Sequence, residues 1–330
     1  MKPLVKILSV LLVALGVVVG PADSAFAATP KKKPVASKKV GKPVARIVKK
    51  KTSVSRKKTS VSRDARLAAA IEADNGPLPK LSSGAVAVID QATGDVLFEK
   101  NASAVVPIAS ITKLMTAMVA LDAQPSLTET LTIGEADIDT IKGTHSRLAV
   151  GTQLSREEML RLALMSSENR AASALSRHYP GGRAAFVAAM NAKAHELGLN
   201  ETRFSDPTGL TPENVSSARD LVKMVNAAHQ YPLIREFSTS EEYQVAVRGR
   251  PQTFRNTNAL VKNDRWTIGL SKTGYISEAG KCLVMQAWLN NKPTIIVLLD
   301  SWGKLTRIGD ANRIKRWVES IAGNAGATPS

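Results

Sequence analysis

The order of strand-like and helix-like segments constrains the fold of this chain more than any other feature. Two short apolar runs, at residues 84–90 and 95–99, flank Ala92-Thr93-Gly94 and predict an opening β-hairpin. Helical patterns follow at residues 107–122, 155–178 and 217–229. The chain then closes with three strand-like runs and one helix, at residues 266–270, 280–289, 294–299 and 305–321.

Strands at both ends of the body, with helices between them, predict an α+β fold and not a regular βαβ alternation. We expect the closing strands to pair with the opening hairpin in one sheet. The first long helix and the last helix would then pack on the faces of that sheet.

The positive charge of the chain lies in one segment and not in the body. The 330 residues carry 45 Lys and Arg side chains against 28 Asp and Glu, a formal net charge of +17. Residues 28–66 hold 15 basic side chains and one acidic one, whereas residues 67–330 hold 28 basic and 26 acidic ones. A nucleic-acid-binding domain would carry its basic surface on the fold itself, so we expect no nucleic-acid partner.

The first 27 residues have the layout of a secretory signal peptide. Lys2 and Lys6 precede an apolar stretch at residues 7–20, and small residues ending in Ala25-Phe26-Ala27 follow. The apolar stretch is short for a membrane span, so residues 1–27 predict export with cleavage near Ala27. A retained anchor is the alternative.

Residues 28–66 predict a basic disordered linker. They contain no aromatic residue, and Lys51-Thr-Ser-Val-Ser-Arg56 is repeated at residues 58–63. Such a segment buries too little apolar area to offset its ordering entropy. It is either a solvated linker without a specific partner or a contact to an anionic membrane or wall surface.

We place a connector at residues 67–80, with a short helix at residues 67–73, and a folded catalytic domain at residues 81–323. Residues 324–330 form a tail. Cys282 is the only cysteine, so no disulfide can form within the chain, and we expect it to be a small buried side chain.

Lys113 is the only ionisable side chain between Asn101 and Leu121. Keeping an ammonium charged in an apolar helix is costly, so burial should lower the pKa of Lys113. Ser110 precedes it by one helical turn at the start of the predicted helix, where the helix dipole favours a developing alkoxide. A neutral lysine can accept the serine proton, so the pair predicts an activated nucleophile that needs no histidine.

Two further motifs distinguish this pair from the other copies of Ser-x-x-Lys, which begin at Ser55 in the linker and at Ser301 in a Trp-Gly loop. Ser167-Glu168-Asn169 is the only Ser-x-Asn in the chain, and Lys272-Thr273-Gly274 is the only Lys-Thr-Gly. The three motifs fall in this order on a predicted helix, a helical region and a strand.

These three motifs in this order resemble those of penicillin-binding proteins and class A β-lactamases, although Glu168 departs from the Asp-type loop of the β-lactamases. Over about residues 82–320 the chain resembles the serine DD-peptidase family, and it is most similar to D-alanyl-D-alanine endopeptidases of the penicillin-binding protein 7 type. The similarity extends to Lys142-Gly-Thr-His-Ser-Arg147, Leu164-Met-Ser-Ser-Glu-Asn-Arg-Ala171, Asp206-Pro-Thr-Gly-Leu210, Arg255-Asn-Thr-Asn258 and Gly280-Lys-Cys-Leu-Val284. The resemblance implies a β-lactamase/DD-peptidase-like fold, with a five-stranded antiparallel sheet flanked by helices and a helical subdomain.

The resemblance also implies the catalytic roles. Ser110 would be the acylated nucleophile, Lys113 its general base, and Ser167 the group that passes a proton toward the leaving amine. The first proton acceptor is disputed for such enzymes and stays open here.

Substrate binding would fall to the remaining motif residues and their neighbour. Asn169 would hold the substrate backbone and Lys113, Lys272 would add positive potential, and Thr273 would bind a substrate carboxylate or carbonyl. Gly274 would let the substrate backbone come close to the strand. The backbone N–H groups of Ser110 and Tyr275 would form the oxyanion hole.

The implied activity is that of an exported, periplasmic hydrolase that cuts peptidoglycan cross-links through an acyl-enzyme. Its partners would be peptidoglycan stem peptides, with β-lactam antibiotics as covalent inhibitors. A carboxypeptidase would use the same residues, and a β-lactamase would need a deacylating glutamate, for which Glu201 is the candidate. A non-catalytic wall-binding protein is the alternative outside enzymology. No cofactor is implied, and the scattered histidines, without a His-Glu-x-x-His, predict no metal site.

Overall fold

The computed structural model describes residues 80–325, and the side chains of residues 80–320. The predicted signal peptide, basic linker and short helix at residues 67–73 lie outside the described residues.

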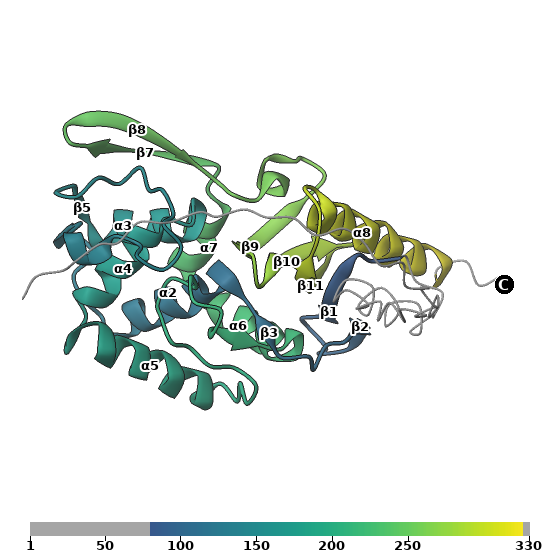
Figure 1. Ribbon diagram of the computed structural model, residues 1–330. Coiled ribbons are helices and arrows are strands. Elements are labelled where there is room, and N and C mark those ends of the chain that lie inside the picture. Colours follow the sequence, from purple (N-terminus) through teal and green to yellow (C-terminus); the bar gives the residue numbers. More distant parts are fainter. Residues whose placement is uncertain (1–79, 326–330) are drawn as a thin grey trace, which may run out of the picture. The chain divides into compact units, whose positions relative to one another are not determined.

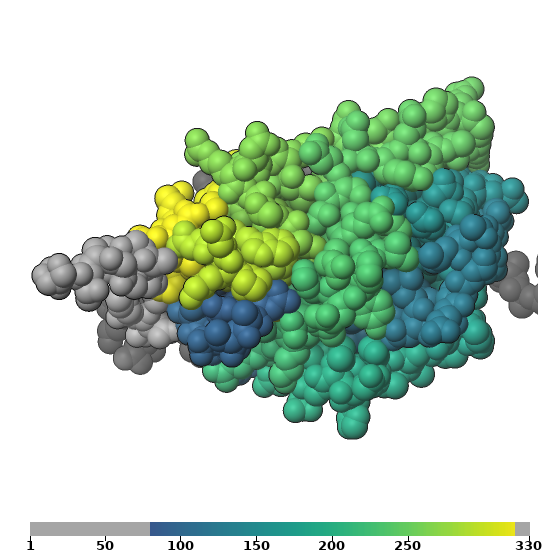
Figure 2. Space-filling model, turned by 180° about the vertical axis from the view of Figure 1, so that it is seen from behind, coloured from purple at the N-terminus to yellow at the C-terminus, as the bar shows by residue number. Residues whose placement is uncertain are grey.

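The centre of the described body is one antiparallel sheet of five strands in the order β2-β1-β11-β10-β9 (Figure 1). Its members are β1 (Ser83–Asp90), β2 (Val96–Lys100), β9 (Thr267–Ile276), β10 (Gly280–Leu289) and β11 (Lys292–Ser301). β1 pairs with β11 along its length, for example Val86 with Leu298. Figure 2 shows blue residues from the first described part of the chain beside the yellow-green residues of the closing strands. The predicted α+β fold and the pairing of the opening hairpin with the closing strands are confirmed.

Both faces of the sheet are covered, so β1 is buried along its whole length. Alternate side chains of a strand point to opposite faces. Val86 and Val88 pack with Ile314 of helix α8 (Thr306–Ala325) in one apolar core. Ala85 and Ala87 belong to the other core, which contains side chains of α2 (Lys113–Asp122) and α6 (Ala218–Ala228).

The segment between β2 and β9 forms the helical subdomain, whose helices gather away from α8 (Figure 1). Its further helices are α3 (Arg156–Met165), α4 (Asn169–Arg177), α5 (Gly182–Glu196) and α7 (Pro232–Thr239). Single 3-10 turns are η1 (Ala109–Thr112), η2 (Glu135–Asp137) and η3 (Ala259–Lys262). Two-stranded ladders are β3 (Val106–Pro107) with β6 (Val215–Ser216), β4 (Thr130–Thr132) with β5 (Gln153–Ser155), and the projecting hairpin of β7 (Glu242–Val247) with β8 (Arg250–Arg255).

Among the described residues, no helix has both the length and the apolar character needed to span a bilayer.

The prediction of a continuous helical stretch over residues 155–178 is wrong. The predicted capping box at its start is present, since Ser155 and Glu158 cap each other's backbone N–H groups. The helix nevertheless stops at Met165, because Ser167 adopts φ +62° and the Glu168 N–H bonds back to the Leu162 carbonyl. The chain therefore turns a corner at Ser167 before α4 begins.

Two predicted boundaries also move. Residues 106–107 pair as a strand with β6, so the α-helix expected from residue 107 begins only at Lys113, after the turn η1. The strand expected at residues 266–270 extends to Ile276 because it pairs with β10 along its length, and it therefore includes the whole Lys-Thr-Gly motif.

Candidate active site

Ser110 lies in the turn η1, directly after a residue in the left-handed backbone region. Ala109 has φ +49° and is fully buried. A non-glycine residue is strained in this region, and such strain persists only where the surrounding structure holds it. Gly209 and Gly274 supply that surrounding. A Cβ on Gly209 would lie 2.0 Å from the Ala109 carbonyl oxygen, and a Cβ on Gly274 would lie 3.1 Å from the Ser110 nitrogen.

The side chain of Lys113 is fully buried, and its amine contacts three oxygen atoms. Nζ lies 2.8 Å from Ser110 Oγ, 2.7 Å from Asn169 Oδ1 and 2.7 Å from the Thr208 carbonyl oxygen. The turn η1, which leads directly into α2 at Lys113, thus brings the predicted serine and lysine into hydrogen-bond contact.

Burial lowers the pKa of Lys113 from its ordinary value to about 7, against the opposing effect of the Asp206 and Glu168 carboxylates. A neutral lysine amine has two N–H groups and one lone pair. Asn169 Oδ1 and the Thr208 carbonyl can only accept hydrogen bonds, so they take the two N–H groups. The lone pair then faces Ser110 Oγ, where it can accept the hydroxyl proton.

The corner between α3 and α4 carries the second motif. Ser167 Oγ accepts a hydrogen bond from Lys272 Nζ at 2.9 Å, and Asn169 is the first residue of α4. Because its oxygen already accepts from Lys272, the Ser167 hydroxyl can donate its own proton elsewhere. The left-handed conformation of Ser167 ends the helix at this point. If the helix continued, it would separate the Ser167 side chain from Lys272.

The third motif lies within the edge strand β9. Lys272 is buried, and burial together with the positive charges of Lys113 and Arg307 holds its pKa well below the ordinary value. Thr273 is also buried, and its Oγ1 lies 2.6 Å from Thr257 Oγ1. The Tyr275 side chain is exposed.

The structure also shows a packing reason for glycine at position 274. A Cβ at this position would lie 2.8 Å from the Ile108 carbonyl oxygen and 3.1 Å from the Ala109 Cβ. The space that glycine leaves is therefore filled by the segment before Ser110. Gly274 allows β9 to pack against the turn that carries the serine.

Sequence reasoning did not place Thr208, Asp206 and Gly209 at the site. Asp206 Oδ1 accepts hydrogen bonds from the backbone N–H groups of Thr208 and Gly209, and this turn presents the Thr208 carbonyl to Lys113. The signal was the Asp-Pro-Thr-Gly sequence, which is typical of a tight turn. A turn sequence alone does not show which distant side chain its carbonyl contacts.

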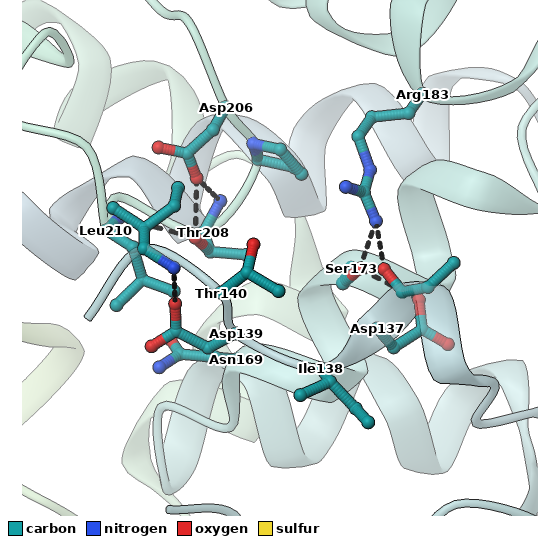
Figure 3. Close-up of a pocket in the computed structure, with 13 residues that line it drawn as sticks. Asp137, Ile138, Asp139, Thr140, Asn169, Ser173, Arg183, Asp206, Thr208 and Leu210 are labelled. Atoms are coloured by element: carbon teal, nitrogen blue, oxygen red, sulfur yellow. Dashed lines mark hydrogen bonds between the residues drawn. The ribbon is translucent and has the colours of Figure 1, made fainter. Parts of the chain in front are cut away.

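A cavity lies on the helical side of the site (Figure 3). Asn169 and Thr208, which both contact Lys113, line it together with Asp139 and Asp206. Figure 3 shows Arg183, Ser173 and Asp137 on the opposite side, where Arg183 donates a hydrogen bond to Ser173 Oγ at 2.6 Å. Within residues 80–325, no group of three or more His, Cys, Asp or Glu side chains is placed to hold a metal ion.

Comparison with known proteins agrees with this geometry. The family model of D-alanyl-D-alanine carboxypeptidases matches residues 71–303, which include all three motifs. A D-alanyl-D-alanine endopeptidase of Pseudomonas aeruginosa is 53% identical over 243 residues, which cover 73% of this chain and 78% of that protein. One of Escherichia coli is 49% identical over 244 residues, which cover 73% of this chain and 79% of that protein. The crystal structure of the Streptomyces K15 DD-transpeptidase superimposes with a TM-score of 0.69 at 29% identity, covering 74% of this chain and 100% of the other.

Proposed function

Because the chain belongs to the D-alanyl-D-alanine carboxypeptidase family of serine peptidases, we propose that it is an exported endopeptidase that cuts peptidoglycan cross-links through an acyl-enzyme at Ser110. The observation that carries this proposal is the buried Lys113 amine, 2.8 Å from the Ser110 hydroxyl. The two endopeptidase relatives, about half identical to this chain, support the choice of endopeptidase.

Acylation begins when Ser110 Oγ attacks the carbonyl carbon of a D-alanyl residue and its proton passes to Lys113 Nζ. The carbonyl oxygen becomes an oxyanion, which the N–H groups of Ser110 and Tyr275 stabilise. The close approach of β9 to the turn that carries the serine supports this pairing, because a Cβ added to Gly274 would lie 3.1 Å from the Ser110 nitrogen.

Collapse of the tetrahedral intermediate breaks the bond to the amine nitrogen and leaves an ester on Ser110. The departing amine takes a proton from the Ser167 hydroxyl, and Lys272, 2.9 Å away, returns one to Ser167. The proton that Lys113 took from Ser110 makes up the balance, so both lysines end the step as they began it. Water then hydrolyses the ester and restores the Ser110 hydroxyl. Asn169 and Thr273 hold the substrate backbone and a substrate carboxylate or carbonyl, and Lys272 adds positive potential beside them.

Digestion of purified muropeptides tests the proposed reaction. We expect the protein to convert cross-linked dimers into monomers, as followed by liquid chromatography and mass spectrometry. Prior incubation with benzylpenicillin should block this conversion. Trimming of pentapeptide monomers with dimers left intact would instead identify a carboxypeptidase, the second candidate, which the matched family model favours.

Mass spectrometry of the protein after exposure to benzylpenicillin tests the nucleophile. We expect the added mass on the proteolytic peptide that contains Ser110, and we expect the adduct to be long-lived. Rapid turnover of penicillin would indicate a β-lactamase. Glu201, the candidate deacylating residue for that activity, is exposed, and its backbone N–H donates to Asp220 Oδ2.

The rate of acylation should depend on the protonation of Lys113. A base works only when it is unprotonated, and the pKa of Lys113 is about 7, so activity is lost as the pH falls through this value. Between pH 6 and pH 8, we expect the second-order rate constant for acylation by benzylpenicillin to rise about tenfold. Stopped-flow or quenched-flow measurement of the adduct gives this profile, and a flat profile would contradict the role of Lys113.

Export and the contact of the linker belong to the same proposal. Amino-terminal sequencing of the protein from the periplasm should find cleavage near Ala27. If residues 28–66 contact anionic surfaces, the mature protein should co-sediment with vesicles containing anionic lipids at low salt, and deletion of these residues should abolish the effect. Unchanged sedimentation after the deletion would leave the segment as a plain linker.

A further inference from the structure

We propose that Thr144 is a positioning residue that fixes the orientation of the Asn169 amide, so that its oxygen and not its NH2 group faces Lys113. This inference rests on the proposed function, in which Lys113 accepts the Ser110 proton. Thr144 belongs to the segment Lys142-Gly-Thr-His-Ser-Arg147, to which neither the motifs nor the proposed mechanism assigns a role.

The first step concerns the hydrogen of the Thr144 hydroxyl. Thr144 Oγ1 lies 2.7 Å from Asp139 Oδ2, and the same carboxylate oxygen accepts from the Thr144 N–H at 2.8 Å. Partial burial of Asp139 opposes ionisation, but hydrogen bonds from Thr144, Lys142 and Ile141 hold the pKa of this carboxyl below its ordinary value. An ionised carboxylate only accepts, so the Thr144 hydroxyl must donate its one hydrogen to Asp139.

The second step concerns the amide of Asn169. Its side chain lies 3.0 Å from Thr144 Oγ1. Because the hydrogen of that hydroxyl is already used, only its lone pairs face Asn169, and they can bind only a donor. The Asn169 NH2 group must therefore point to Thr144, which directs Oδ1 to Lys113 Nζ at 2.7 Å. Figure 3 shows Asp139 and Asn169 next to each other on the same side of the cavity.

The third step shows why this orientation matters for the chemistry. With Oδ1 facing it, the neutral amine of Lys113 donates to Asn169 and to the Thr208 carbonyl and keeps its lone pair for Ser110. With the amide reversed, the NH2 group would donate to that lone pair and compete with the Ser110 hydroxyl for it. The reversed amide would also place a donor against the ammonium form of Lys113. By orienting the Asn169 amide, Thr144 thus leaves the lone pair of Lys113 available to the Ser110 hydroxyl.

The test compares Thr144→Val, which keeps the shape of the side chain but lacks the hydroxyl, with Thr144→Ser, which keeps the hydroxyl. We expect Val to lower the second-order rate constant for acylation by benzylpenicillin by about 10- to 100-fold, as for other residues that orient a functional group. We expect Ser to stay within about threefold of the wild-type protein. The pH profile of the Val variant should also shift to lower pH, because the reversed amide disfavours the ammonium form of Lys113.

Two controls separate this role from a structural one. Thr144→Ala removes the hydroxyl without the second methyl group of valine and should show the same loss, so the test does not depend on one variant folding. Thr128→Val changes the same residue type at an exposed position that does not line the cavity, and it should acylate at the wild-type rate. Equal losses in Val and Ser, or an unshifted pH profile, would overturn the positioning role. Failure of the wild-type protein to acylate at Ser110 would instead refute the proposed function.

Discussion

Replacing Lys113 by methionine should slow acylation by benzylpenicillin at least about a thousandfold, within the range measured for loss of a general base. A serine hydroxyl is a poor nucleophile until a base removes its proton. Among the described residues, the side chain of Lys113 is the only nitrogen base in hydrogen-bond contact with Ser110 Oγ. Methionine resembles lysine in length and is apolar, so it fills the same buried space without an amine.

The melting temperature of the variant and the replacement of a second, exposed lysine provide the controls for this result. The melting temperature of Lys113→Met should change little, because loss of the buried amine removes a desolvation cost while Asn169 Oδ1 and the Thr208 carbonyl lose a donor. Lys292→Met changes an exposed lysine on β11 and should leave acylation unchanged. A Lys113→Met protein that kept a tenth or more of the wild-type rate would show that another group is the base.

Replacing Gly209 by alanine should both destabilise the protein and remove most of its acylation. Gly209 has φ +80°, and an added Cβ would lie 2.0 Å from the Ala109 carbonyl oxygen and 2.9 Å from the Ser110 nitrogen. The backbone strain and the overpacking together should cost about 2–5 kcal/mol. This corresponds to a fall in melting temperature of roughly 5–15 °C.

In the Gly209 variant, the acylation rate should fall by more than the loss of folded protein explains. The reason is that the atoms displaced by the added Cβ belong to the turn that carries Ser110. Gly94→Ala is the matched control. Gly94 also has φ +80°, but its added Cβ would meet nothing within 4 Å. It should therefore show the conformational cost of about 1–2 kcal/mol with normal acylation per folded molecule. Similar acylation rates in the two variants would show that the contact with Ala109 does not position Ser110.

The parts of the fold that follow from local pattern were predicted from the sequence, and those that need distant partners were not. Alternating and helical periodicity located the sheet strands β1, β2, β10 and β11 and the helices α2, α6 and α8. The hairpin of β7 and β8 was missed, because its strands are polar and largely exposed. The corner at Ser167 was missed because its left-handed conformation depends on the packing around it, and serine carries no signal for it.

The sequence by itself determined which residues can react: a lone lysine one turn after a serine, and two further motifs in a fixed order. Those features are local, so the chain's own spacing reveals them. Only the tertiary structure decided that the Thr208 carbonyl, 95 residues away in the chain, lies against the Lys113 amine. It likewise decided that Thr144 and Gly209 act on the site, because hydrogen-bond direction and steric contact depend on atoms that only folding brings together.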